Sequence, residues 1–153
     1  MKSVKEAVKR ELSSEHDEQC ALMMWKWLNI SRLPELANLY AIPNGGARDA
    51  VTGAKLKAEG VVSGIPDLHL ACARGIYAGL FIEMKVKPNK PTSKQLEVME
   101  NLRRQGYAAV VCYSASEAIA VIEDYLKGRP YCEIVRDVNE WAVQKYCVSE
   151  AKT

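Results

Sequence analysis

This sequence of 153 residues lacks the features that mark membrane and exported proteins. No apolar run approaches the roughly 20 residues that a membrane-spanning helix needs, so we expect no contact with a membrane. Residues 1–14 mix lysine, arginine and glutamate without an apolar stretch, whereas a secretory signal requires one. We therefore expect a cytoplasmic protein.

The spacing of cysteine and glycine excludes two common kinds of site. The five cysteines form no C-x-x-C pair, which argues against structural zinc, and their odd number favours reduced thiols over a disulfide framework. The turn Asn44-Gly45-Gly46 matches neither the G-x-G-x-x-G fingerprint nor a P-loop. These absences disfavour a nucleotide-dependent small-molecule enzyme, and we expect no organic cofactor.

Charge is nearly balanced over the whole chain, but basic residues are concentrated in one segment. The 21 basic and 19 acidic residues give a net charge of +2, too little for nucleic-acid binding through bulk electrostatics alone. The segment 85–104 is locally basic and offers a stripe of phosphate contacts. Its basic residues are Lys85, Lys87, Lys90, Lys94, Arg103 and Arg104, against Glu97 and Glu100. A solvated helix face is the alternative interpretation of this segment.

Hydrophobic periodicity and turn signals predict a single α/β domain over residues 1–153, with a core of about 14–128 and a C-terminal extension at 129–153. We expect helices at 14–30, 92–105 and 114–127, strands at 39–42, 67–73, 78–86 and 107–113, and a partly helical loop at 47–63. The expected helix caps are Ser14, then Thr92 or Ser93, then Ser114 or Ser116. The predicted order of elements is α-β-β-β-α-β-α.

Two carboxylates and an amine occur where a single site can use them. Side chains alternate between the two faces of a strand, so Glu83 and Lys85 share a face while Met84 points to the other. If the second and third strands form an antiparallel hairpin, Asp67 lies opposite the strand end that carries Glu83 and Lys85. Such a cluster suits a hard divalent cation beside a phosphate ester. A turn acid and an edge-strand ion pair are the alternative interpretation.

These features, taken in order, resemble the PD-(D/E)XK nuclease superfamily. The stretch Gly60-Val61-Val62-Ser63-Gly64-Ile65-Pro66-Asp67-Leu68 is similar to the G-V-x-x-G-x-P-D-L motif of VRR-NUC domains, and Glu83-Met84-Lys85 is similar to the E-x-K motif that follows it. The turn Pro43-Asn44 and the stretch Thr92-Ser93-Lys94-Gln95 also match. The resemblance implies a restriction-endonuclease-like αβββαβ core, in which helices flank a mixed central sheet.

The resemblance also implies a metal site and the groups that serve it. Asp67, Glu83, the Met84 carbonyl and Glu15 are implied as ligands of Mg²⁺, with Mn²⁺ as a substitute. Lys85 is implied to activate water and to stabilise the developing charge.

Two glutamines complete the implied catalytic set. Gln19 lies one helical turn after Glu15 and is implied as a positioning residue, while Gln95 is implied to hold Lys85 or the water in place. Without the resemblance, Glu15 and Gln19 fit an ordinary solvated first turn of a helix, and Gln95 an ordinary polar residue at a helix start.

Seven polar residues are expected to contact the nucleic acid. They lie in the glycine-containing loop after the first strand and around the basic segment, where mobile phosphate contacts are common, and they are Asn44, Arg48, Lys55, Lys57, Lys87, Lys90 and Lys94. Loop solubility is the alternative explanation for the cations of the loop.

The function implied is that of a Mg²⁺-dependent, structure-specific DNA endonuclease, in a bacterium or in a phage-infected host cell. Stand-alone members of the family resemble Holliday-junction resolvases, so we expect a homodimer acting on branched DNA. Trp25 and Trp27 point to different faces of the first helix, and an exposed one would suit self-association. A monomeric flap or nicking endonuclease and a non-catalytic DNA-binding module are the alternatives.

Overall fold

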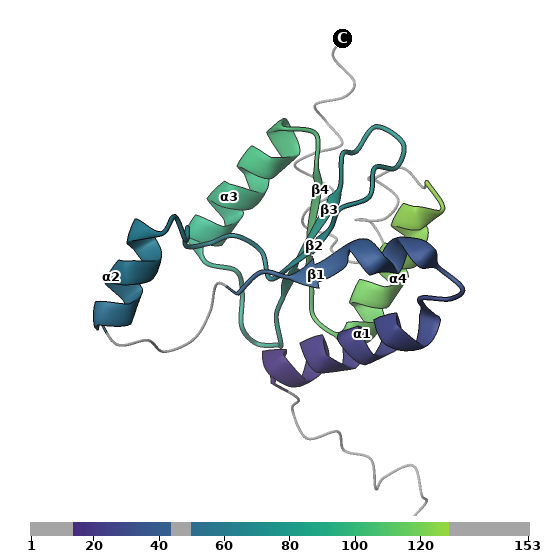
Figure 1. Ribbon diagram of the computed structural model, residues 1–153, viewed down its shortest axis with the longest axis horizontal. Coiled ribbons are helices and arrows are strands. Elements are labelled where there is room, and N and C mark those ends of the chain that lie inside the picture. The colour runs from purple at the N-terminus through teal and green to yellow at the C-terminus, as the bar shows by residue number, and fades with distance from the viewer. Residues whose placement is uncertain (1–13, 44–49, 129–153) are drawn as a thin grey trace, which may run out of the picture.

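The computed structural model describes residues 14–43 and 50–128, which form a four-stranded mixed sheet with helices on both faces (Figure 1). The elements in chain order are α1 (Glu15–Asn29), the 3₁₀ helix η2 (Pro34–Asn38), β1 (Leu39–Ala41), α2 (Ala50–Ala58), β2 (Leu68–Leu70), β3 (Leu80–Met84), α3 (Ser93–Arg104), β4 (Ala108–Cys112) and α4 (Ala115–Leu126). The predicted α/β class and order of elements are confirmed, and η2 is an addition. The predicted C-terminal extension at 129–153 lies outside the described residues.

The sheet runs in the order β1-β2-β3-β4. β1 pairs antiparallel with β2, and β2 with β3, whereas β3 and β4 are parallel and are joined through α3. Parallel neighbours need such a crossover because both strands begin at the same edge of the sheet. Leu68 faces Ile82 across β2 and β3, which confirms the predicted antiparallel hairpin.

The hairpin strands are shorter than the predicted 67–73 and 78–86, because the chain between them leaves the sheet. Arg74 pairs with Tyr77 in an isolated bridge. The Arg74 guanidinium donates to the Leu126 carbonyl at the end of α4 (3.3 Å) and to Glu35 after α1 (2.5 Å). These bonds hold the hairpin loop against other elements, and local β propensity carries no information about them.

Short polar residues define where the helices begin. Ser14 caps α1 by accepting from the Asp17 N–H, and Thr92 caps α3 by accepting from the Gln95 N–H. In both caps the side chain of the third helical residue also accepts a hydrogen bond from the backbone N–H of the cap residue. Each cap therefore satisfies two backbone N–H groups, that of the cap residue and that of the third helical residue. Of the two serines considered for α4, Ser114 is the cap.

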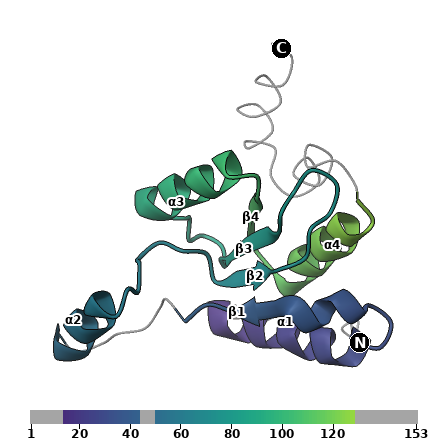
Figure 2. The same cartoon turned by 45° about the horizontal axis from the view of Figure 1, so that its top comes forward.

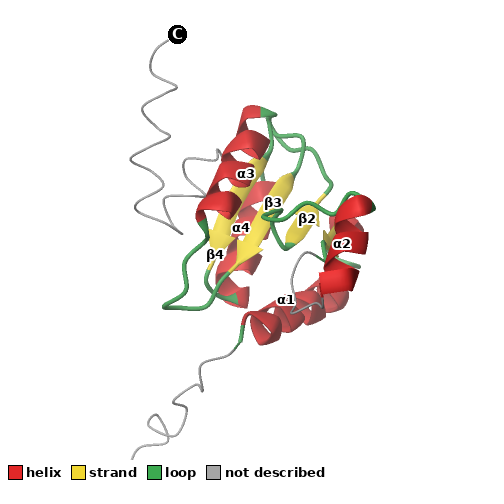
Figure 3. Ribbon diagram, turned by 90° about the vertical axis from the view of Figure 1, so that its left-hand side faces the viewer, coloured by secondary structure: helices red, strands yellow, loops and turns green. Residues whose placement is uncertain are grey.

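The two faces of the sheet are covered unequally. α1 and α4 pack on one face, and α3 covers the other (Figures 2 and 3). The first face holds the main core, in which Leu22, Ile82, Met84 and Tyr125 are almost completely buried. The α3 face has a smaller cluster, formed by Phe81, Met99, Ala109 and Val111. β3 contributes to both clusters because its side chains alternate.

The predicted loop at 47–63 contains a helix that stands apart from the sheet. α2 has no buried residue, and Figures 1 and 2 show it separated from the other helices. Across the described segments 14–43 and 50–128, no helix combines the length and the apolarity needed to span a bilayer.

Candidate active site

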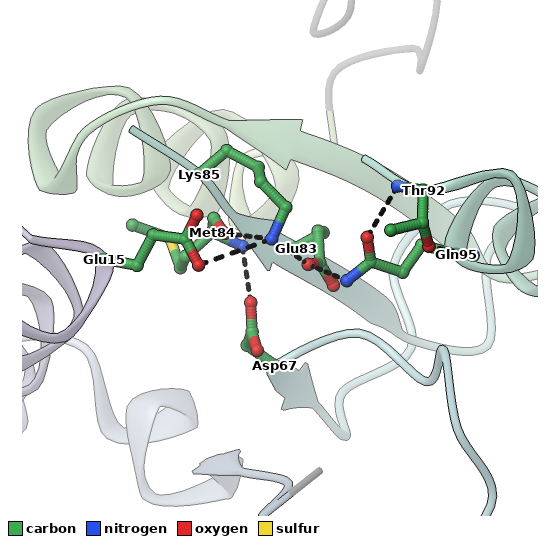
Figure 4. A network of polar contacts seen from close by, with 7 residues as sticks. All are labelled: Glu15, Asp67, Glu83, Met84, Lys85, Thr92 and Gln95. Carbon is green, nitrogen blue, oxygen red and sulfur yellow. Dashed lines mark hydrogen bonds and ion pairs between the residues drawn. The ribbon is translucent and has the colours of Figure 1, made fainter. Parts of the chain in front are cut away.

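The ends of β2 and β3 bring Asp67 beside Glu83 and Met84. Asp67 immediately precedes β2, whose first residue, Leu68, pairs with Ile82 of β3. The Met84 N–H donates to Asp67 Oδ2 at 2.8 Å (Figure 4). The hairpin register, set by alternating apolar residues, therefore fixes the position of the first acid relative to the second.

Gly64 allows the segment before Asp67 to lie against the start of α3. Its backbone has a φ of +86°, and a Cβ at this position would lie 2.9 Å from Lys94 Cγ and 3.2 Å from the Lys94 carbonyl carbon. Any other L-residue would strain the backbone and collide with α3. The glycine of the Gly60–Leu68 motif thus positions the strand that carries Asp67.

Lys85 lies at the centre of the cluster. Its Nζ is 2.6 Å from Glu83 Oε1 and 3.4 Å from Glu15 Oε2, and it donates to the Met84 carbonyl at 3.1 Å (Figure 4). Glu83 is 1% exposed and Lys85 is 8% exposed. Since Glu15 is the first residue of α1, this ammonium links the helix to the end of β3.

Gln95 contacts Glu83, whereas the sequence suggested Lys85 or a water molecule. Its Oε1 accepts from the Thr92 N–H at 2.8 Å, and its Nε2 donates to Glu83 Oε1 at 2.5 Å. The capping box causes this choice, because the bond to the Thr92 N–H commits the amide oxygen and turns the NH₂ group toward β3. Gln95 is therefore a positioning residue for the acid.

Gln19 does not join the cluster. It lies one turn after Glu15 and is half-buried, and in the described part of the chain it makes no hydrogen bond to Asp67, Glu83 or Lys85. Helix geometry places it on the same face as Glu15, but of these two described residues only Glu15 has a contact with Lys85.

Burial and charge shift the pKa of all three central groups. Burial raises the pKa of Glu83 to about 7, against the hydrogen bond from Lys85, and the nearby Asp67 charge adds to the rise. Burial also raises the pKa of Asp67, although its bond from the Met84 N–H opposes the shift. For Lys85, burial alone would lower the pKa, but the contacts with Glu83 outweigh it and raise the pKa. The single ammonium of Lys85 thus lies near three carboxyl groups, those of Glu83, Glu15 and Asp67.

The oxygen atoms of the cluster suit a hard divalent cation, but three of them contact the Lys85 ammonium. Glu83 Oε2 is buried and has no hydrogen-bond partner, and carboxylate and carbonyl oxygens are the ligands that Mg²⁺ prefers. Within residues 14–43 and 50–128, no three His, Cys, Asp or Glu side chains lie close enough to hold a metal ion. Of the ligands that the resemblance implies, Glu83, Glu15 and the Met84 carbonyl contact Lys85 Nζ, and Asp67 accepts from the Met84 N–H.

The described lysines that are expected to contact nucleic acid lie at the surface. Lys55 and Lys57 are exposed on α2, and Lys87, Lys90 and Lys94 are exposed on the loop after β3 and at the start of α3. Lys55 pairs with Glu59 at 3.9 Å, and Lys94 with Glu97 at 3.4 Å. Asn44 and Arg48 lie outside the described residues.

Two further residues have contacts that the sequence did not predict: Thr92 was expected only as one of two possible helix caps, and Glu18 was assigned no role. Thr92 fixes the Gln95 amide, and the pattern T-x-x-Q before an apolar helix was the available signal. Glu18 is 4% exposed, and its Oε2 accepts from the Ala115 N–H at 2.6 Å, which ties α1 to the start of α4. Nothing local distinguishes Glu18 from its acidic neighbours, because its partner is 97 residues away.

Comparison with known proteins agrees with this geometry. The VRR-NUC domain family model matches residues 2–116. A solved structure described as a VRR_NUC domain protein superposes with a TM-score of 0.65 and 32% sequence identity, covering 77% of this chain and 92% of that one. No curated protein matches the sequence. The fold, the acid pair with its lysine, and the family match over most of the chain lead to one conclusion: the protein belongs to the VRR-NUC family of nuclease domains.

Proposed function

We propose that this protein is a Mg²⁺-dependent DNA endonuclease that acts on branched DNA as a homodimer, in the manner of a Holliday-junction resolvase. The convergence of Asp67, Glu83 and Lys85 at the end of one hairpin is the observation that supports it most directly. Three charged groups are held in a largely buried position where they cost stability, and such clusters are common at catalytic sites.

The residues of the cluster have separate tasks in this proposal. Asp67, Glu83 and the Met84 carbonyl hold the metal, with Glu15 at the rim and Gln95 fixing Glu83. When bound, Mg²⁺ or Mn²⁺ polarises a phosphoryl oxygen and lowers the pKa of water. The raised pKa of Lys85 keeps it protonated at neutral pH. Lys85 therefore acts as a cation and hydrogen-bond donor to the developing charge.

Exposed lysines on α2 and on the segment after Lys85 suit contacts with the DNA backbone. Lys55 and Lys57 stand on the separate helix α2, and Lys87, Lys90 and Lys94 border the cluster through the loop after Lys85. Phosphate contacts of this type orient a duplex without reading its sequence. A preference for DNA structure over base sequence fits this arrangement.

An apolar stripe on α1 supports self-association. Met24, Trp27 and Leu28 follow helical spacing, and their exposed fractions are 66%, 65% and 76%. Large apolar side chains gathered on one exposed face often mark an interface. Two copies would also supply the two active sites that paired cuts in a junction require.

The two alternatives differ from this proposal in what they leave unexplained. A monomeric flap or nicking endonuclease uses the same chemistry but has no use for the exposed stripe on α1. A non-catalytic DNA-binding module has no use for a buried acid pair with a lysine, which costs folding stability. We therefore place the dimeric nuclease first.

The test is cleavage of end-labelled four-way junction, flap and linear duplex DNA in Mg²⁺, with Lys85→Ala and excess chelator as controls. Paired, symmetric cuts in the junction that disappear in both controls are expected. Cleavage of flaps or duplex alone would favour the monomeric alternative, and cleavage that persists in chelator would exclude the metal-dependent mechanism. Sedimentation at micromolar protein should give the mass of a dimer, and Trp27→Asp should give a monomer.

A further inference from the structure

The Lys85 ammonium is surrounded by the oxygen atoms that a metal ion would use. Glu83 Oε1, the Met84 carbonyl oxygen and Glu15 Oε2 lie 2.6, 3.1 and 3.4 Å from Nζ. All three belong to residues able to hold a cation at this site. An ammonium carries one positive charge and three donor hydrogens, so these contacts satisfy it both electrostatically and by hydrogen bonding.

We propose that Lys85 is an internal cation that occupies the metal position in the metal-free protein, and that metal loading displaces its side chain. This inference rests on the proposed function, because it concerns the metal site of the nuclease. Lys85 then has two roles. Before metal loading its ammonium competes with the metal ion, and after loading it donates hydrogen bonds to the substrate.

The state of the other oxygens supports displacement over binding beside Lys85. Glu83 Oε1 already accepts from both Lys85 and the Gln95 amide, so while Lys85 stays in place a cation could use only one Glu83 oxygen, the buried and unpartnered Oε2. Asp67 Oδ2 accepts from the Met84 N–H. In this arrangement, with Nζ in contact with both Glu83 and Glu15, no three His, Cys, Asp or Glu side chains of the described residues come close enough to hold a metal ion. Removal of the ammonium would free oxygens from Glu83, Met84 and Glu15 together.

The side chain of Lys85 has a route out of the cluster. Its side chain is 10% exposed, and the Glu15 side chain on the same side is 39% exposed. The four-carbon stem of lysine is flexible and reorients without a change of backbone. A displaced ammonium would reach solvent, where it can meet a phosphate group of the substrate.

The first test measures Mn²⁺ binding by electron paramagnetic resonance, in the absence of DNA. It compares the wild type with Lys85→Met, which keeps the stem and removes the charge, and with Lys85→Arg, which keeps the charge. Lys127→Met is the matched control, since the Lys127 side chain is 66% exposed and pairs with Asp124 at the end of α4. A pH of 8.5 limits competition by protons for the carboxylates.

Lys85→Met should bind Mn²⁺ at least about tenfold more tightly than the wild type, because the competing charge is gone. The melting temperature of Lys85→Met should also rise more on addition of Mn²⁺, since the metal would replace a missing counter-ion. Equal or weaker binding by Lys85→Met would overturn the inference and leave the nuclease intact. No binding by either protein would instead overturn the metal site of the proposed function.

A second measurement follows Lys85 in the wild-type protein and uses a variant only to assign its signal. In wild-type protein labelled with ¹⁵N, the buried and hydrogen-bonded Lys85 ammonium should give an NMR signal, which the loss of that signal in Lys85→Arg identifies. Titration with Mg²⁺ should shift or remove this signal in step with the amide of Met84. An ammonium signal that stays unchanged while the Met84 amide reports metal binding would show that Lys85 is not displaced.

Discussion

The two faces of the sheet differ in chemistry although one strand, β3, serves both. Ile82 and Met84 point into the main core with α1 and α4, and Phe81 and Glu83 point toward α3. On the first face every buried side chain of β3 is apolar. On the second face the apolar cluster gives way to charge at the end of the strand.

Because of this difference, the buried residues of the first face contribute to the stability of the fold, while Glu83 on the second face belongs to the candidate active site. Burying an apolar side chain stabilises the fold, whereas burying a carboxylate costs free energy unless it is paired. The larger core on the α1 and α4 face offsets the cost of burying Glu83 and Lys85 at the end of β3. We expect substitutions on the two faces to change different measured quantities.

The largest expected effect is on activity, from Asp67→Asn on the charged face. The amide oxygen of asparagine can still accept from the Met84 N–H, so the hairpin should remain folded while a metal ligand loses its charge. Cleavage in Mg²⁺ should fall on the order of 10³-fold, measured as the single-turnover rate on end-labelled DNA. Glu97→Gln on the exposed surface of α3 is the control and should cleave normally. A comparable loss of cleavage by Glu97→Gln would mean that the overall charge of the protein, rather than Asp67 at this site, determines the cleavage rate.

The next effect is on stability, from Ile82→Ala on the apolar face. Ile82 is completely buried, and its truncation should lower the free energy of unfolding by about 2–5 kcal/mol, measured by urea denaturation. Cleavage below the melting temperature should change little. Ile76→Ala, at a position that is 80% exposed, should leave stability near that of the wild type. A stability loss at Ile82 below that at Ile76 would contradict our assignment of the main core.

A smaller effect is a dependence of stability on pH in the metal-free protein. The folded-state pKa of Glu83 is raised from 4.5 to about 7, so the folded state binds the proton more tightly than the unfolded chain. Its contribution to stability is therefore fully present below about pH 4.5 and is lost as pH rises to about 7.

Other groups also titrate in this pH range, so the contribution of Glu83 must be measured as a difference between two proteins. Burial lowers the pKa of His69 below 6.5, which acts in the opposite direction over part of the same range. Urea denaturation of the wild type and of Glu83→Gln from pH 4.5 to 8 isolates the Glu83 contribution as the difference between the two curves. A difference that does not change with pH would refute the raised pKa.

The smallest effect compares the helix caps on the two faces. Thr92→Ala and Ser114→Ala each remove a cap and should each cost about 1 kcal/mol of unfolding free energy. Only Thr92→Ala should also reduce cleavage, by several-fold, because Thr92 orients the Gln95 amide that holds Glu83. Thr92→Ser should restore both properties. Equal cleavage by the two alanine variants would limit Thr92 to a purely structural role.

Local patterns predicted the features that depend on near neighbours in the chain. Alternation in β3 placed Glu83 and Lys85 on one face, and short polar residues marked the starts of α1, α3 and α4. The strand ends were wrong where Arg74 is held by Leu126, a contact between residues 52 positions apart. The roles of the site residues remain predictions, which the variants above can test.

The sequence by itself determined the α/β class, the order of elements and the face shared by the acid and the lysine, because periodicity and capping act over a few residues. Only the tertiary structure decided which groups meet across the chain: Glu15 with Lys85, Gln95 with Glu83, and Glu18 with Ala115. The physical reason is that such contacts depend on the relative placement of helices and strands. That placement is set by the packing of the whole core rather than by any local pattern.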